Sequence, residues 1–281
     1  MARTQDGTAI RVGECCSSAA HDIVAHLRWE PRAYVLPPRS ALLWRYIDFS
    51  KYVALIRDQA VFFCRADRLG DRFELAKGIA TRKAEWDKDH LEWYREVLRN
   101  PPPGASWDTT HEAVESRALE LLRQEDASGL SDLRSTFISC WHENEGESEA
   151  LWRLYCGTGP GVAIQTTVAS LLNALWLWPN IAVGRVQYID FKGTFTGVNE
   201  AAFRKRISLS HEREVRAVQT VYHGERPEGL SVRVRIDALI HRVVVSPLSP
   251  RWFAAVVRDT TQRFGVDVQT EHSELLLEPF Y

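Results

Sequence analysis

The sequence has no apolar run long enough to cross a bilayer, which takes about twenty residues, and its N-terminus lacks the apolar core of a secretory signal. Neither membrane insertion nor export is therefore expected. Cysteines are few and odd in number, five in 281 residues, which argues against a disulfide framework and fits a reducing compartment. These absences together predict a cytoplasmic protein.

The chain also lacks the usual signatures of a metal centre and of several domains. Cys15 and Cys16 are too close in sequence to hold a metal without further ligands, and no histidine is placed to complete a site, so no metal is predicted. There is no long Gly/Ser/Pro linker, internal repeat or low-complexity tract. A single domain over residues 41–281, preceded by an N-terminal extension over residues 1–40, therefore fits better than two domains.

The composition supplies a large core and an ordinary surface. Hydrophobic residues make up 45% of the chain, and ten of its residues are tryptophan. Charged residues make up 26%, with a formal net charge of -2, which argues against obligate nucleic-acid binding but leaves a local basic groove open.

The most structured stretch of the sequence covers residues 134–165. Residues 136–141 are rich in β-branched and aromatic side chains and predict a strand with two differently used faces. A polar loop and a short helix follow, with Trp152 and Tyr155 one turn apart in its packed face. Gly161 then precedes a buried strand, and its place after Pro160 predicts a positive φ or a closely packed backbone.

The remaining patterns predict strands and helices in alternation. Residues 41–47 form the first strand, and residues 76–123 form a helical insertion whose second helix ends near Leu122. Residues 201–208 read as a helix that exposes Arg204, Lys205 and Arg206, and a strand covers residues 215–221. The predicted fold is α+β, with a mixed, mostly antiparallel sheet core, flanking helices and the helical insertion.

Several segments, in a constant order over residues 41–280, resemble the bacterial domain-of-unknown-function family 2971 (DUF2971). These segments are LWRY at 43–46, FCRAD at 63–67, GDRFE at 70–74, SCW at 139–141, LWRLY at 151–155 and HEREVR at 211–216. The family has no agreed activity, so the resemblance implies the limits of the domain and leaves its chemistry open.

Four residues of these segments are polar and lie in or beside predicted strands. Arg45 lies in the first strand, Ser139 lies in the middle of the strand over residues 136–141, and the E-x-E pair Glu212 and Glu214 leads into a later strand. This order resembles that of R-S-E type ADP-ribosyltransferases, which split the nicotinamide–ribose bond of NAD. The sequence departs from that pattern after Ser139, where Cys140 and Trp141 replace the usual S-T-S. We expect the strands of Arg45 and Ser139 to lie in one sheet, with both side chains facing a common cleft.

The resemblance implies a catalytic role for three residues. Glu214 would stabilise an oxocarbenium-like transition state, and Glu212 would polarise the acceptor. Ser139 would orient the nicotinamide ribose or brace Glu214.

It also implies that the cofactor is NAD and that three residues bind it. Arg45 would hold a phosphate of NAD with its planar fork of donors, and Tyr46 or Trp141 would stack on the nicotinamide ring. The partner would be a nucleotide or NAD-like small molecule, and the acceptor stays open. A toxin or phage-defence effector would fit such an activity.

Other interpretations of the same residues stay open. Arg45 could instead form a buried structural salt bridge with Glu74 or Glu214, and the E-x-E segment could be a charge-paired edge strand. The chain could be a non-catalytic sensor that binds a nucleotide or a partner without turnover. A metal-dependent nuclease that uses Asp67, Asp71 and Glu74 is a further alternative.

Overall fold

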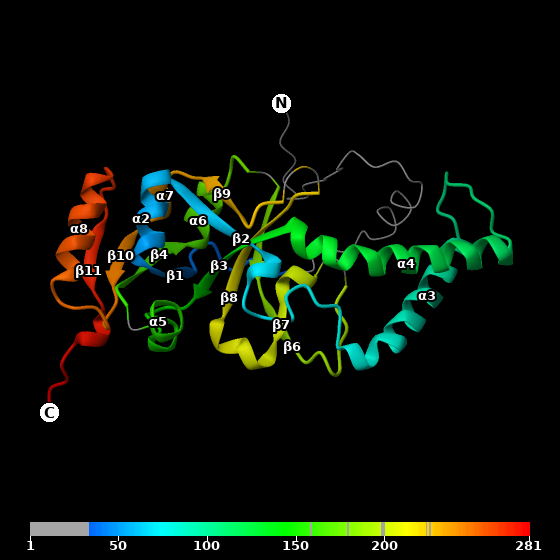
Figure 1. Cartoon of the computed structure of the whole chain (residues 1–281), viewed down its shortest axis with the longest axis horizontal. Helices are drawn as coiled ribbons and strands as arrows, with labels where there is room; N and C mark the ends of the chain where they lie inside the picture. Colours follow the sequence, from blue (N-terminus) through cyan, green and yellow to red (C-terminus); the bar gives the residue numbers. More distant parts are fainter. Residues whose placement is uncertain (1–33, 158, 179, 198–199, 223, 225) are drawn as a thin grey trace.

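The computed structural model describes residues 34–281 except 158, 179, 198–199, 223 and 225, so most of the predicted N-terminal extension lies outside the described residues (Figure 1). The described chain is α+β, with a mixed, mostly antiparallel sheet and flanking helices, which confirms the predicted fold class. Among the described helices, none combines the length and apolar character that a bilayer crossing requires.

The main sheet has nine strands, and a smaller sheet has two. The path of the main sheet is β11 (Gln269–His272), β10 (Arg242–Val245), β4 (Gly161–Thr167), β1 (Leu42–Asp48), β3 (Thr136–Glu143), β2 (Ala60–Arg65) and β9 (Gly229–Arg233), with β8 (Glu214–Thr220) beside β3 and β5 (Ile181–Arg185) beside β8. Neighbouring strands of this sheet are antiparallel except β10 and β11. The small sheet pairs β6 (Gln187–Ile189) with β7 (Arg204–Arg206) in parallel.

The sheet branches at β3. One edge of β3 pairs with β8 along residues 136–142. At its other edge, β1 pairs with residues 142–143 and β2 pairs with residues 137–138. Since β1 and β2 meet opposite ends of the same strand, they diverge beside the middle of β3 and leave a gap between them.

Helices cover the two faces of the sheet unequally. The largest core lies on the face covered by α2 (Phe49–Asp58), α6 (Val168–Ala174), α7 (Ile236–Leu239) and α8 (Phe253–Arg263). We call this face the helical face. The other face carries α5 (Glu149–Cys156) over β1 and β4, and the 3₁₀ turn before β7 against β3 and β8. We call it the acidic face, for reasons given below.

Two long helices project from the sheet as an arm (Figure 1). Helix α3 (Lys83–Arg99) packs against α4 (His111–Ser135) through an apolar core of its own, which is separate from the cores of the sheet. The second helix of the insertion was predicted to end near Leu122, which is too early, because α4 continues to Ser135 and runs directly into β3. Gly129 does not end this helix, because a single glycine in a helix lowers its stability by only about 1 kcal/mol relative to alanine.

The helix predicted over residues 201–208 is wrong. This segment forms a 3₁₀ turn, then β7, then the 3₁₀ helix η4 (Ile207–Glu212). Strand alternation consequently turns Lys205 inward, where it is buried, although the helical prediction left it exposed. The sequence misled because three consecutive basic residues are typical of a solvated helix, and strand pairing with β6 overrides that preference.

Candidate functional site

Arg45 lies in the gap between β1 and β2. Its Nη1 donates to Ser139 Oγ at 3.0 Å, and its Nη2 donates to the backbone oxygen of Phe62 at 2.9 Å. The guanidinium also lies 5.4 Å from the centre of the Trp141 ring. The expectation that the strands of Arg45 and Ser139 lie in one sheet is therefore confirmed, and the two side chains are hydrogen-bonded. The common cleft that they were expected to face stays a prediction.

Within the described residues, Arg45 forms no salt bridge with a carboxylate, and the predicted alternative of a bridge to Glu74 or Glu214 is wrong. Burial lowers the pKa of Arg45 to about 10, so the side chain still carries its charge at neutral pH. A guanidinium has five N–H donors, and two of its nitrogens make the hydrogen bonds described above. The Arg45 side chain is half-buried, and a partly desolvated charge without a counter-ion is costly, which makes Arg45 a candidate site for an anion.

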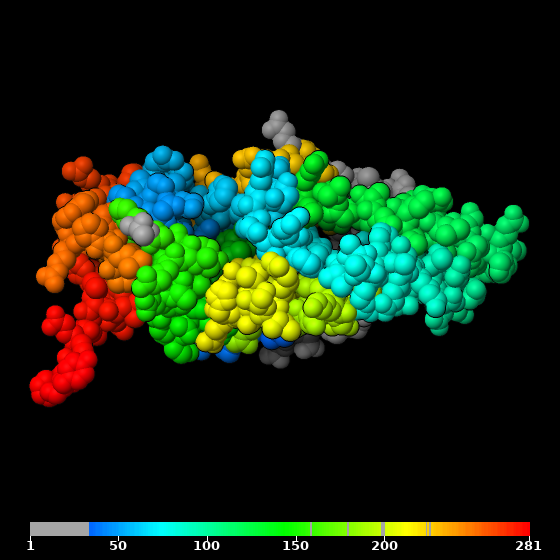
Figure 2. Space-filling model, turned by 60° about the horizontal axis from the view of Figure 1, so that its bottom comes forward, coloured from blue at the N-terminus to red at the C-terminus, as the bar shows by residue number. Residues whose placement is uncertain are grey.

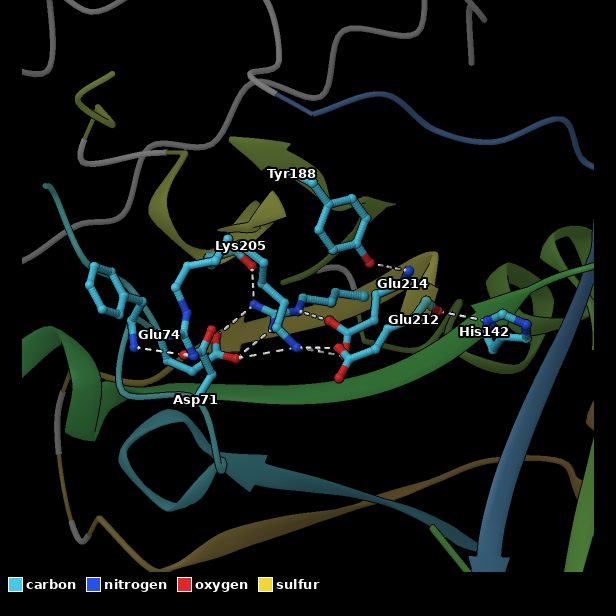
Figure 3. A network of polar contacts seen from close by, with 11 residues as sticks. Asp71, Glu74, His142, Tyr188, Lys205, Glu212 and Glu214 are labelled. Carbon is cyan, nitrogen blue, oxygen red and sulfur yellow. Dashed lines mark hydrogen bonds and ion pairs between the residues drawn. The ribbon is translucent and has the colours of Figure 1, made fainter. Parts of the chain in front are cut away.

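Glu74, Lys205, Glu212, Glu214 and Arg216 form a buried charged cluster on the opposite face (Figure 3). Arg216 donates through Nη1 and Nη2 to both oxygens of Glu74 at 2.8 and 2.7 Å, and through Nε to Glu214 at 2.8 Å. Lys205 bonds to Glu212 and lies 3.3 Å from Glu214 Oε1. The cluster thus joins two cations to three carboxylates, and it gives the acidic face its name.

A local backbone turn brings the two glutamates of the E-x-E segment together. Glu212 ends η4 and Glu214 begins β8, so Glu212 lies outside the strand. Arg213 between them is left-handed, with φ 40°, a conformation that few residues other than glycine adopt. The turn, and not strand alternation, directs both carboxylates to Lys205.

The cluster moves the pKa values of the two glutamates in opposite directions. Burial, and then the neighbouring charge of Glu214, raise the pKa of Glu212 in spite of Lys205. Burial also opposes ionisation of Glu214, but Arg216 and Lys205 outweigh it and lower the pKa of Glu214. Two carboxyl groups with separated pKa values are the usual basis for distinct acid and base roles.

The six residues predicted for the site divide between the two faces of the sheet. Ser139 pairs with Ala217 in β8, whereas Glu214 pairs with His142, and paired residues share a face. The helical face therefore receives Arg45, Ser139 and Trp141, and the acidic face receives Tyr46, Glu212 and Glu214. Ser139 accordingly does not brace Glu214, and that part of the prediction is wrong.

Neither predicted stacking ring is open on the surface. Trp141 is 1% exposed in the core of the helical face, and its Nε1 has no hydrogen-bond partner among the described residues. Tyr46 is 5% exposed, packs edge-on against Trp152 at 4.9 Å and accepts a hydrogen bond from the Ser148 backbone at 2.8 Å. Both rings support the core in this conformation.

Cys140 lies between the two polar groups. Its side chain shares the acidic face with Arg216, its pairing partner in β8. It is close enough to Arg45 to affect the pKa of that guanidinium, and it interacts in turn with Glu214 and Arg216. Cys140 thus interacts electrostatically with members of both groups, while its own side chain lies on the acidic face.

Sequence reasoning missed three residues of this region. Arg216 lies two positions after Glu214, and strand alternation could have placed both on one face. Lys205 gave no such signal, because its strand was not recognised. Tyr155 of α5 was assigned to packing, but it is partly exposed and interacts with Glu212 and Glu214, where α5 and η4 lie side by side on the surface (Figure 2).

The three acids of the nuclease alternative do not converge. Asp67 pairs with Arg65, Asp71 with Arg206, and Glu74 with Arg216. Across the described part of the chain, no three His, Cys, Asp or Glu side chains are arranged to hold a metal ion. The nuclease prediction is therefore wrong for these residues.

Comparisons with known proteins add little to this geometry. No protein-family model matches the chain, so the resemblance to the DUF2971 family is not supported, and no curated protein sequence matches either. Among solved structures, the chain is similar to Thermus sp. 2.9 DarT in complex with ADP-ribosylated ssDNA, with 10% sequence identity over 86% of this chain and 97% of that chain. The TM-score of this match is 0.37, and a similarity of that extent carries no conclusion about the activity of this chain.

Proposed function

We propose that the chain is an NAD-dependent enzyme of the ADP-ribosyltransferase type, with the dinucleotide bound at Arg45. The observation that carries this proposal is a charged arginine, held by Ser139 and the Phe62 carbonyl, that has no carboxylate partner among the described residues. Planar guanidinium groups match the oxygens of a phosphate and bind them through paired hydrogen bonds. A pyrophosphate would supply the missing counter-ion.

The charged cluster supports the enzymatic part of the proposal, the cleavage of the nicotinamide–ribose bond. For the cluster to act on a ligand bound at Arg45, that ligand would have to extend past Cys140 to the face of β3 where Glu214 lies. Cleavage of an N-glycosidic bond builds positive charge on the ribose, and an ionised carboxylate stabilises that charge. Glu214 keeps its negative charge to low pH, because Arg216 and Lys205 lower its pKa against the effect of burial.

One observation favours a second candidate, a sensor that binds a nucleotide without turnover. Both carboxylate oxygens of Glu214 are already occupied, one by Lys205 and one by Arg216. An enzyme would need one of these contacts to open when substrate binds. A sensor would need only the anion site at Arg45.

Two variants separate these candidates. Arg45→Ala should weaken NAD binding at least about tenfold, because phosphate contacts to a guanidinium are among the stronger hydrogen bonds. Glu214→Gln should leave NAD binding intact and lower the rate of nicotinamide release about 10²-fold or more. Calorimetry measures the binding, and chromatography of free nicotinamide measures the rate.

Arg153→Ala is the matched control, because Arg153 is exposed on α5 and pairs with Glu149 of its own helix. NAD binding without nicotinamide release by the wild-type protein would favour the sensor. An absence of NAD binding by the wild-type protein would refute both the enzyme and an NAD sensor.

A further inference from the structure

His142 lies beside the charged cluster, and one hydrogen bond defines which of its ring nitrogens carries the hydrogen. It is 5% exposed, and it pairs with Glu214 across β3 and β8. Its Nδ1 lies 2.6 Å from the backbone oxygen of Glu212 (Figure 3). A carbonyl oxygen can only accept, so Nδ1 must carry the hydrogen of this bond.

The carbonyl that receives this hydrogen bond is held in place by its neighbours. Arg213 adopts the left-handed turn, and its backbone oxygen accepts a hydrogen bond from the Glu143 N–H at 3.0 Å. On the far side of the turn, the Glu214 N–H donates to the hydroxyl of Tyr188 at 2.8 Å. The turn cannot rotate its Glu212 carbonyl away without breaking these contacts, so the orientation of the imidazole is fixed as well.

The second ring nitrogen, Nε2, has no hydrogen bond to any residue that the structure describes. The charged groups that act on the ring are Glu143 on its own strand and Arg213 and His211 on the η4–β8 turn, while Tyr46 of β1 contributes a neutral ring 6.2 Å away. Burial is the largest influence and lowers the pKa of His142 in spite of the hydrogen bond to Glu212. At neutral pH the ring is therefore neutral, with a free lone pair on Nε2.

We propose that Nε2 of His142 takes the proton of the acceptor during the transfer of ADP-ribose. This inference rests on the proposed function and deepens it. Glu212 was expected to assist the acceptor, but its carboxylate is bound to Lys205. His142 is the neighbouring group with a free basic atom.

The heteroatom of the acceptor forms a bond to C1′ of the nicotinamide ribose, and the bond between C1′ and the nicotinamide nitrogen breaks. That electron pair leaves with nicotinamide, which becomes neutral, and the proton of the acceptor passes to Nε2. A general base at this position is needed when the acceptor must lose a proton, as a hydroxyl group, a nucleobase nitrogen or water must. A carboxylate acceptor is already ionised and needs no such base. The inferred substrate class is therefore a protonated oxygen or nitrogen nucleophile.

The tautomer can be measured without any substrate. Long-range proton–nitrogen NMR spectra of the full chain, with His142→Asn used to assign the signal, should show a neutral His142 with its hydrogen on Nδ1 at pH 7.5. A charged ring, or a hydrogen on Nε2, overturns the inference.

A kinetic experiment then tests the role, with NAD as substrate and water as acceptor. His142→Asn is the informative variant, because the asparagine N–H₂ can replace the Nδ1 donor to Glu212 and leaves no base at the position of Nε2. The expected result is an unchanged Kd for NAD, a fall in kcat of about 10²-fold or more, and loss of the acidic limb of the pH–rate profile. His111→Asn, at an exposed histidine that begins α4 in the arm, should keep the wild-type rate and profile.

The outcomes distinguish the two proposals. If the wild-type protein releases nicotinamide and His142→Asn keeps both its rate and its acidic limb, the role of His142 is wrong and the proposed function stands. If the wild-type protein binds NAD without releasing nicotinamide, the transfer step is overturned and the sensor remains. If it binds no NAD, the proposed function and the transfer step fall together.

Discussion

Arg216 holds Glu74 through two hydrogen bonds, at 2.7 and 2.8 Å, across 142 positions of the sequence. The Arg216 side chain is fully buried, and it also bonds Glu214 and the backbone oxygen of Ala202. One side chain thereby joins β8 to the loop ahead of α3 and to the turn before β7. The charged cluster is thus a structural junction of three segments as well as a candidate acid site.

Removal of Arg216 should be among the most destabilising single changes in the described chain. Arg216→Met keeps much of the apolar volume but leaves Glu74 and Glu214 as buried carboxylates without their main cation. Breaking a buried ion pair in this way costs about 3–5 kcal/mol of unfolding free energy. Urea denaturation, followed by tryptophan fluorescence, measures this loss of unfolding free energy. Arg57→Met, at an exposed pair with Asp58, should leave the midpoint unchanged.

The lowered pKa of Glu214 makes its contribution to stability dependent on pH. Because the folded state holds this carboxylate ionised, the contribution is present above the unfolded pKa near 4.5 and is lost as the pH falls through the folded value. Glu214→Gln should therefore melt well below wild type at pH 7, with a gap that narrows as the pH drops below about 4.5. A gap in Tm that stays constant from pH 7 to pH 3 would show that Glu214 is not ionised in the fold.

Gly161 should not tolerate a side chain. Its φ is not positive, so that part of the expectation is wrong, but the closely packed backbone is confirmed: a Cβ there would lie 2.5 Å from Cys156 Sγ and 3.3 Å from the Ile47 oxygen. Gly161→Ala should cost about 1–3 kcal/mol through overpacking. Cys156→Gly removes both Sγ and the Cβ that the new methyl would approach to 2.6 Å, so in this background the same change should cost clearly less, and a thermodynamic cycle of four denaturation curves measures the difference. Equal costs in both backgrounds would exclude the Cys156 contact as the cause.

The arm should lose stability independently of the sheet. Leu98 is buried in the core shared by α3 and α4, so Leu98→Ala should cost about 2–4 kcal/mol locally. Hydrogen exchange should then rise along α3 and the first half of α4, with β3 and β8 unchanged. Leu130→Ala, at a side chain that is 71% exposed, is the control. A uniform rise in exchange over arm and sheet would show that the two unfold together.

Alternation and β propensity predicted the separate strands of Arg45 and Ser139, and the resemblance to R-S-E type ADP-ribosyltransferases led us to expect these strands in one sheet. These patterns could not predict on which face each side chain lies relative to Glu214, since a shift of one residue in the pairing of β3 and β8 exchanges the faces. That register depends on tertiary pairing, with Ser139 opposite Ala217, and no local pattern encodes it.

The charged cluster was hidden for a related reason. Glu74, Lys205 and Arg216 come from a loop, a short strand and a long strand, and each is ordinary in its local context. Their burial follows from their mutual pairing, which cancels much of the cost of desolvation. The sequence identified the E-x-E segment, but the left-handed Arg213 that brings its two carboxylates together requires tertiary contacts such as the Glu143 bond.

The branch of the sheet at β3 has a consequence for synthesis of the protein. β3 pairs with β1 and β2, which precede it, but its full-length partner β8 begins at Glu214, about 70 residues after β3 ends at Glu143. Until β8 leaves the ribosome, the nascent chain presents a strand of β-branched and aromatic residues with one edge open, and such an edge templates pairing between chains. Contacts of this sequence separation also slow folding. Yield of the folded protein should therefore depend on how long that edge remains unpaired.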